Sequence, residues 1–218
     1  MKSILKYIYI IPAALLLLLV LSGCEKLPLL KDIEREPVTL DPKHNMTAWE
    51  YLNKPRTDTL FNMMLRAIKY AGMEDEYKKP NRTYVVLANQ AITSLNVTTG
   101  VESINSYFGR RLVKGVVGKK LQDYPVAEIR NLLKYHIIEG YHTFGILTPN
   151  PEPFTTLRTD SLVNTVTMNI GNTSSYALQF NNFPRSFKTQ NARTSNLQMN
   201  DNCVIHVVNT YLEYGLTP

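Results

Sequence analysis

This sequence predicts an α+β fold, because helix-type patterns come first along the chain and strand-type patterns come last. Apolar residues recur at helical spacing over 60–68 and again over 126–133. Beyond Gly140 the pattern changes to strand-like runs separated by Asn, Gly, Ser and Pro, as in TTLRTDSLVNTVTMNI, SYALQF and CVIHVVNTYL. Helices and strands that are segregated in this way are typical of α+β domains and not of alternating βαβ units.

The start of the chain has the organisation of a secretory signal. Two lysines precede an apolar run at 7–21, and two small residues follow it. The run contains Pro12 and is shorter than the about 20 apolar residues that a membrane-spanning helix needs. Its end, Leu-Ser-Gly-Cys at 21–24, resembles the bacterial lipobox, in which the signal is cut before the cysteine and the cysteine is acylated. We therefore predict a signal peptide over 1–23 and lipid on Cys24; a plain signal peptide with an incidental cysteine is the alternative.

Residues 24–45 are predicted to form a lipidated tether in front of a domain at 46–218. Three prolines and mixed charges occur in this stretch without a sustained helical or strand period. Several acyl chains hold a protein durably on a membrane. The membrane is therefore the first predicted partner, and the predicted location is the cell envelope, on the outer membrane.

The composition fits a packed domain with a modest positive charge. The chain of 218 residues is 44% hydrophobic, contains 13 tyrosines and has a formal charge of +6. Loss of Lys2 and Lys6 with the signal leaves 22 basic against 18 acidic residues, or +4. Only the segment 110–120 approaches a basic stripe, so no nucleic-acid partner is expected. With lipid on Cys24, Cys203 is the one remaining thiol and no intramolecular disulfide can form.

Two helices are predicted at the start of the domain. Thr47 and Glu50 have the spacing of a capping box, which predicts a short helix directly after it. Thr57 or Asp58 can cap the next helix, which carries the first apolar stripe and ends at Gly72.

The middle of the chain is predicted to contain a buried strand and more helix. The β-branched and aromatic run TYVVLA at 83–88 indicates the strand. Residues 101–124 indicate further helix with a basic middle that glycines interrupt. Pro125 suits the first position of a helix whose apolar stripe begins with Val126, and Gly140 closes this unit.

Three segments in this order carry a family pattern: TYVVLANQAI at 83–92, LLKYHIIEG at 132–140 and NCVIHVVNTYL at 202–212. Together they resemble the fasciclin-like FAS1 domain, and the likeness runs over about 46–214. The first segment is the most divergent, and in the third Cys203 replaces the usual glycine. The resemblance implies a β-sandwich or wedge of strands flanked by helices. It also implies adhesion, or contact with matrix or carbohydrate.

The resemblance further implies structural roles for residues in the three segments. His136 would close a helix and His206 would lie in a strand, both as buried imidazoles bonded to backbone or side chains. Thr83, Asn89 and Tyr135 would belong to the same framework.

No catalytic site, metal site or cofactor is predicted. His136 and His142 lack the same-face helical spacing of a zinc motif, and no Cys or carboxylate cluster joins them. Cys203 lies in an apolar run without an evident basic activator. A Gly-x-Ser-x-Gly elbow and a phosphate-binding glycine loop are also missing from the sequence. The prediction is a non-catalytic protein; an enzyme that uses His136 or His206 is an alternative.

A ligand surface is predicted between Phe154 and Asn202, in a stretch longer than the family norm. Apart from the strand-like run SYALQF, its part at 172–196 is predicted to be loop, with aromatic rings and hydrogen-bonding groups suited to sugars or to a protein interface. Core or hairpin packing of these aromatics is the alternative, and the basic segment 110–120 is the next candidate surface. The predicted ligand residues are Tyr176, Phe180, Phe183, Arg185 and Phe187.

The predicted function is a lipid-anchored cell-envelope module for adhesion, or for binding an extracellular protein or glycan. An accessory lipoprotein of an outer-membrane uptake complex for glycan nutrients is the alternative. The triplets Asp58-Thr59-Leu60 and Asp160-Ser161-Leu162 resemble the O-glycosylation acceptor of Bacteroidetes-type bacteria, although such triplets are common by chance.

Overall fold

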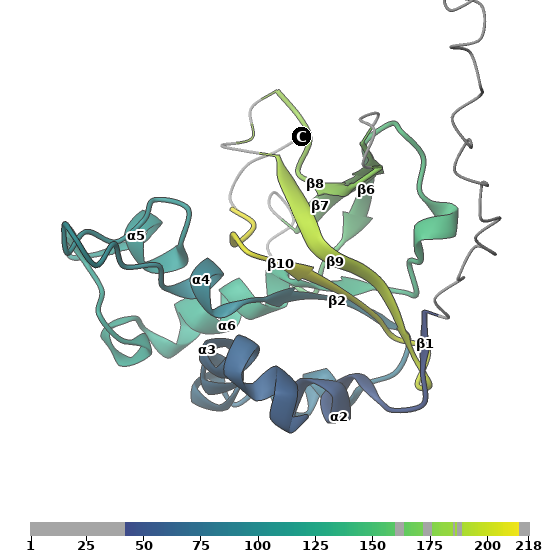
Figure 1. Ribbon diagram of the computed structural model, residues 1–218, viewed down its shortest axis with the longest axis horizontal. Helices are drawn as coiled ribbons and strands as arrows, with labels where there is room; N and C mark the ends of the chain where they lie inside the picture. The colour runs from purple at the N-terminus through teal and green to yellow at the C-terminus, as the bar shows by residue number, and fades with distance from the viewer. Residues whose placement is uncertain (1–41, 160–163, 172–175, 185, 187–188, 214–218) are drawn as a thin grey trace, which may run out of the picture. The chain divides into compact units, whose positions relative to one another are not determined.

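The structure is a computed structural model of the chain (Figure 1). The described residues are 42–213 except 160–163, 172–175, 185 and 187–188. The predicted signal peptide, Cys24 and nearly all of the predicted tether lie outside them. No helix within the described part is long and apolar enough to cross a membrane.

The first helix, α2, spans Ala48–Leu52 and begins at the predicted capping box. The Glu50 N–H donates to the Thr47 hydroxyl at 3.2 Å, and the Thr47 N–H donates to the Glu50 carboxylate at 2.7 Å. Strand β1, Lys43–His44, precedes this helix and pairs in parallel with a later strand. The sheet therefore includes two residues that the sequence analysis assigned to the tether.

Helix α3 spans Pro55–Ala71 and starts earlier than predicted. Pro55 occupies the first helical turn, where a missing N–H costs nothing and the fixed φ favours the helix. Lys54 is the N-cap residue, so Thr57 and Asp58 lie inside the helix and the prediction that one of them caps it is wrong. Gly72 ends the helix as predicted, with a φ of 61° that glycine adopts without a steric penalty.

The prediction of further helix over 101–124 is largely wrong. The segment contains the short helix α5 (Tyr107–Arg110), a hairpin of β3 (Leu112–Val113) and β4 (Val116–Val117), and the 3-10 helix η2 (Leu121–Asp123). Lys114 and Gly115 turn the hairpin with φ values of 49° and 83°. Two left-handed residues in succession are typical of a tight hairpin turn, which interrupts any helix.

Helix α6 spans Val126–Tyr135, and Pro125 is its N-cap residue instead of its first helical residue. Val126 is 37% exposed, so it does not belong to the buried stripe, contrary to the prediction. The other members of that stripe are buried. They supply the apolar face with which α6 packs into the core.

One mixed sheet forms the framework of the folded unit. Its further strands are β2 (Arg82–Leu87), β5 (Ile137–Glu139), β6 (Glu152–Thr155), β7 (Thr165–Ile170), β8 (Leu178–Phe180), β9 (Gln190–Met199) and β10 (Val204–Val208). Their order across the sheet is β5-β2-β10-β9-β8-β7-β6. Strands β2 and β10 pair in parallel, and the other neighbours are antiparallel. A bridge from Ile138 to Thr156 connects the two ends of this order, so the sheet nearly closes on itself.

The helices and strands are segregated, which confirms the α+β class. In the view of Figure 1, α2, α3 and α6 lie on one side of β2 and β10, and β6, β7 and β8 lie on the other. Aromatic side chains fill much of the core between the elements. The completely buried tyrosines among the largest core side chains are Tyr77, Tyr84, Tyr107, Tyr124 and Tyr135.

Strand β9 occupies sequence that was largely predicted to be loop. Its composition is polar and poor in β-branched residues, which does not favour a strand. Its first residues pair with β8, and most of its length pairs with β10. Backbone pairing with neighbours distant in sequence therefore outweighs the local preference.

Candidate interaction surface

The imidazole of His136 lies at the end of α6 and is completely buried. Its Nδ1 donates to the Leu132 carbonyl at 2.8 Å, and its Nε2 accepts from the Leu212 N–H at 3.0 Å. Burial lowers the pKa of His136 to about 4. Since both nitrogens of this neutral ring are engaged with backbone groups, neither is available for proton transfer or for a metal ion.

The second motif histidine, His206, is also completely buried and engaged at both nitrogens. Its Nδ1 accepts from the Asn196 N–H at 3.1 Å, and its Nε2 donates to the His142 carbonyl at 3.3 Å. Desolvation lowers its pKa to about 4. Among the described residues, no group of three or more His, Cys, Asp or Glu side chains is arranged to hold a metal ion.

Tyr135 connects α6 with the sheet. Its hydroxyl donates to the Thr165 carbonyl at 3.0 Å and accepts from the Asn181 Nδ2 at 3.2 Å. Burial raises the pKa of Tyr135 to about 12. The hydroxyl is therefore neutral, and its hydrogen bonds are made inside the domain and not to a partner.

The remaining two framework residues also bond to the backbone. The Thr83 hydroxyl donates to the Gly140 carbonyl at 2.8 Å and accepts from the His142 N–H at 2.9 Å. The Asn89 Oδ1 accepts from the Met63 N–H in α3 at 2.9 Å. The three sequence motifs thus contribute bonds between elements and leave these five polar side chains with internal partners.

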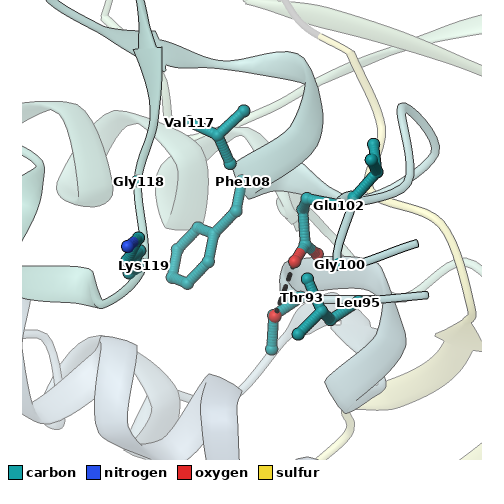
Figure 2. A pocket seen from close by; sticks show the side chains of 9 residues that line it. Thr93, Leu95, Gly100, Glu102, Phe108, Val117, Gly118 and Lys119 are labelled. Carbon is teal, nitrogen blue, oxygen red and sulfur yellow. Dashed lines mark hydrogen bonds between the residues drawn. The ribbon is translucent and has the colours of Figure 1, made fainter. Parts of the chain in front are cut away.

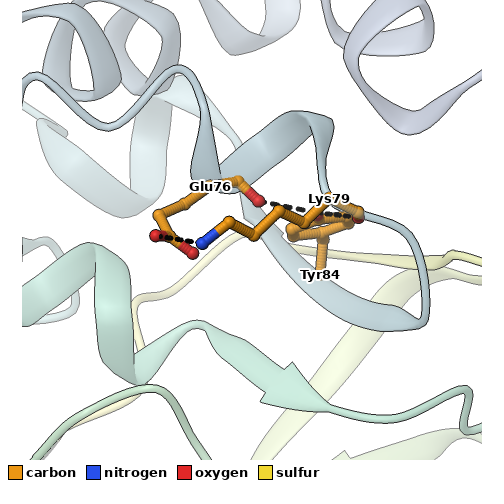
Figure 3. A network of polar contacts seen from close by, with 3 residues as sticks. All are labelled: Glu76, Lys79 and Tyr84. Atoms are coloured by element: carbon orange, nitrogen blue, oxygen red, sulfur yellow. Dashed lines mark hydrogen bonds and ion pairs between the residues drawn. The ribbon is translucent and has the colours of Figure 1, made fainter.

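A polar network attaches the 3-10 helix η1, Glu76–Lys78, to β2 (Figure 3). The Tyr84 hydroxyl lies 2.9 Å from the carbonyls of both Glu76 and Lys79, and the Lys79 Nζ pairs with the Glu76 carboxylate at 2.7 Å. The buried Cys203 Sγ lies 3.4 Å from the same Lys79 carbonyl. Desolvation raises the pKa of Cys203 to about 12, so its thiol stays protonated and is a poor nucleophile.

The ligand surface predicted in the long segment is only partly at the surface. Phe180 is completely buried, so its assignment to this surface is wrong: alternate side chains of β8 point into the core. Phe183 is half-buried, and Tyr176 is 67% exposed. Arg185 and Phe187 lie outside the described residues.

A ladder of amide side chains crosses β7, β8 and β9 in the same segment. The Asn169 Nδ2 donates to the Gln179 Oε1 at 3.1 Å, and the Gln179 Nε2 donates to the Asn191 Oδ1 at 3.3 Å. The Asn182 Nδ2 also donates to the Gln179 Oε1, at 3.3 Å. These amides therefore bond to one another. Among the described members of the predicted ligand surface, Tyr176 is the one whose side chain is largely exposed.

A different set of side chains is exposed at the end of the folded unit where α4 (Asn89–Ile92) and α5 lie (Figure 1). Large aliphatic residues there reach high exposure, 95% for Val97 and 66% for Val116. They occupy two segments, 95–104 and 112–117. We name this set the hairpin surface: Leu95, Val97, Val101, Ile104, Leu112, Val116 and Val117.

A cavity of about 600 Å³ lies between the two segments of the hairpin surface. In Figure 2 the Phe108 ring projects between Lys119 on one side and Glu102 and Thr93 on the other. Aliphatic side chains from both segments complete the wall, among them Leu95 and Val117. The volume and the predominantly apolar lining are those of sites that accept a ligand or a partner's side chain.

The loop on one side of the cavity is fixed by the buried carboxylate of Glu102. This carboxylate accepts hydrogen bonds from the Ser94 N–H, from the Thr93 hydroxyl at 3.3 Å and from the Ser106 hydroxyl at 2.8 Å. Ser106 also caps α5, since its hydroxyl accepts from the Gly109 N–H at 3.2 Å. The wall of the cavity is therefore built on a bonded framework.

Lys119 lies on the other side of the cavity, and Lys120 follows it in the chain. Both lysines, like Lys114 at the tip of the hairpin, are exposed and form no ion pair within the part of the chain that the structure describes. Arg110, in contrast, pairs with Glu213 at 3.2 Å. The basic segment that was the next candidate surface in the sequence thus borders an apolar surface.

The apolar part of this surface was missed in the sequence. Residues 101–124 were predicted as further helix with a basic middle, and no exposed apolar surface was predicted there. The turn-forming residues just before them, Asn-Val-Thr-Thr-Gly at 96–100, are the signal that could have indicated an exposed loop.

The fold and the surface define an α+β domain whose motif histidines serve packing and whose exposed aliphatic side chains gather at one end. A model of the Fasciclin domain matches residues 59–214. The chain therefore belongs to the Fasciclin (FAS1) domain family, as the three motifs indicated.

A solved structure shows the same fold. It is that of a FAS1 domain pair from the insect cell adhesion molecule fasciclin I, with a TM-score of 0.52 and 12% sequence identity. The match covers 77% of this chain and 51% of that chain, so the present chain spans about half of the domain pair. A comparison with curated proteins found no match.

Proposed function

We propose that the protein is a lipid-anchored, non-catalytic module of the cell envelope that binds a protein partner through the hairpin surface. Cys24 supplies the anchor, and the stretch from there to Asp41 supplies reach. A tether of that length extends to at most about 60 Å, enough to lift a domain clear of a lipid surface. The structural neighbour is a cell adhesion molecule, which agrees with a binding role.

The observation that carries this proposal is the exposure of the hairpin surface. A folded domain shows scattered exposed aliphatic residues, but a group of them around an apolar cavity marks an interaction site. The five framework side chains of the sequence motifs do not provide that site, since they bond internally. The non-catalytic part of the proposal rests on the neutral, engaged rings of His136 and His206 and on the protonated thiol of Cys203.

Glycan binding is a second candidate function, favoured by Tyr176, which precedes Gln179 of the amide ladder by three residues in the chain. An exposed aromatic ring and planar amides are groups that contact sugars. The described amides are largely paired with one another, which is why we rank the protein partner first.

Site-specific photo-crosslinking in intact producing cells tests the proposal. A photoreactive amino acid is placed at Val97, Val116 or Tyr176, and for comparison at Ile146, an exposed aliphatic residue outside the hairpin surface. We expect protein adducts from the two hairpin positions and none from position 146. Adducts at position 146 alone, or at no position, would contradict a protein partner at this surface, and adducts at Tyr176 alone would favour the second candidate region.

A further inference from the structure

We propose that the partner is a protein segment that inserts apolar side chains into the cavity and places carboxylates against Lys119 and Lys120. This inference rests on the proposed function and specifies the chemistry of the partner. Three features carry it: the shape of the cavity, the charge distribution around it and the kind of side chains that are exposed.

The cavity requires an occupant that projects side chains. The cavity lies between the loop at 95–102 and residues 117–119 at the end of the hairpin, and Phe108 projects between these two segments. A cavity of about 600 Å³ is filled by side chains that project from a partner, and a flat partner surface would leave it empty. A peptide segment with Leu or Phe side chains can cover Leu95, Val101 and Val117 and remove them from water at about 25 cal/mol per Å².

The charge distribution selects an acidic occupant. Lys119 and Lys120 have no ion-pair partner within the described residues, so a partner's carboxylates can pair with their ammonium groups. The carboxylate of Glu102 lies on the opposite side of Phe108 from Lys119 (Figure 2), and three donors engage it. The Asp123 carboxylate accepts from the N–H groups of Lys119 and Lys120, and the two lysines outnumber it at this border. Complementary charge at such a rim raises association rates and selects the partner.

The exposed side chains favour a protein over a lipid surface. Proteins in contact with the membrane–water interface are enriched in Trp and Tyr there. The hairpin surface presents Val, Leu and Ile, and the Phe108 ring beside it is buried at the cavity. A concave apolar site with a basic border is the form that receives side chains of another protein.

Peptide binding to the full chain in nanodiscs of neutral phosphatidylcholine tests the inference. Three fluorescent peptides are compared by anisotropy: one with Leu and Phe flanked by Glu, one with the same Leu and Phe flanked by Lys, and one in which Ser replaces the apolar residues between the Glu flanks. We expect the first peptide to bind at least tenfold more tightly than the other two, with affinity that falls several-fold between low and high salt. Equal binding of the Lys-flanked peptide, or binding of none of the three, overturns the inference.

Variants assign the binding to the surface. Val101→Glu, and separately the charge reversal of Lys119 and Lys120 to Glu, should each weaken the binding of the first peptide at least tenfold. Ile146→Glu and Arg66→Glu are the matched controls, since both residues are exposed elsewhere, and should change affinity less than twofold. Unchanged thermal midpoints show that the variants fold; unaltered peptide affinity in both test variants overturns the inference.

Co-sedimentation with phosphatidylglycerol vesicles, which pellet while nanodiscs do not, tests the lipid alternative. Sedimentation that Val101→Glu abolishes would replace the protein partner by an anionic membrane. If the crosslinks at Val97 persist while the acidic peptide fails, the proposed function stands and only the partner chemistry is wrong.

Discussion

Single residues in this domain show why motif histidines need not be catalytic. His136 and His206 each place one nitrogen as donor to a carbonyl and the other as acceptor from a backbone N–H. Only a neutral ring can make both bonds. Protonation would place a ring N–H against a backbone N–H. Burial also disfavours the charged ring, and this desolvation lowers both pKa values.

The two histidines predict a loss of stability at mildly acidic pH. Both pKa values are about 4 in the folded state and near 6.5 in the unfolded chain, so the unfolded state binds more protons between these values. The contribution of the two neutral rings to the free energy of unfolding is fully present above pH 6.5. It is lost as the pH falls toward 4, at up to about 1.4 kcal/mol per pH unit for each ring. Urea unfolding at a series of pH values measures this slope. A His206→Gln variant should reduce it, and a flat profile from 7 to 4.5 would contradict the assignment.

Tyr135→Phe is predicted to destabilise the domain by about 1–2 kcal/mol. The change removes the buried hydroxyl that bonds Thr165 and Asn181, and it leaves the Thr165 carbonyl without that donor. Tyr176→Phe is the control, because that ring is exposed. This variant should unfold at nearly the wild-type midpoint. Equal midpoints for both variants in thermal unfolding would show that the Tyr135 hydroxyl contributes nothing.

At the scale of elements, the hairpin surface depends on a close approach between α5 and the preceding loop. A Cβ added at Gly109 would lie 2.1 Å from the Ser103 carbonyl oxygen, a backbone atom that cannot turn away. The same loop is bonded to α5 through Glu102 and Ser106. Glycine is therefore required here for space.

Gly109→Ala is predicted to cost about 1–3 kcal/mol of unfolding free energy, because the methyl group overpacks the contact with Ser103. Hydrogen exchange should show faster opening over 94–109 in this variant. Gly145→Ala is the matched control, since its nearest neighbour would be the Thr143 hydroxyl at 3.9 Å. A Gly109→Ala protein as stable as the control would mean that the loop shifts without penalty.

Elements with strong local signals were predictable from the sequence. The capping box at Thr47, the strand TYVVLA and the end of α3 at Gly72 each have a local physical cause. The β3–β4 hairpin was not predicted, because β-branched residues and lysines at this spacing also fit a helix face. Strand β9 was not predicted, because its polar sequence is held by partners far away in the chain.

At the scale of the whole molecule, closure of the sheet and exposure of the candidate site both depend on long-range contacts. The bridge from Ile138 to Thr156 joins strands that no local pattern connects. Aliphatic residues in a sequence are first assigned to the core. Whether Val97 or Val166 is buried depends on which element covers it, so only the basic border of the hairpin surface could be located in advance.

Membrane attachment is predicted to depend on Cys24. Cys24→Ala should abolish metabolic labelling with palmitate and move the protein from the membrane fraction to the soluble fraction, because acyl chains on this residue are the proposed anchor. Cys203→Ala should keep both the label and the membrane fraction, since that thiol is buried in the fold. Labelling that persists in Cys24→Ala would rule out this anchor.

Hydroxyl-radical footprinting of the protein on intact cells, compared with the purified full chain, tests most directly whether the hairpin surface is occupied in its own setting. Oxidation of Leu95, Val97 and Val101 should fall several-fold on cells, because a bound partner excludes solvent from these side chains, while Ile146 and Tyr176 should oxidise equally in both samples. Equal oxidation of Leu95, Val97 and Val101 on cells and in solution would contradict the account.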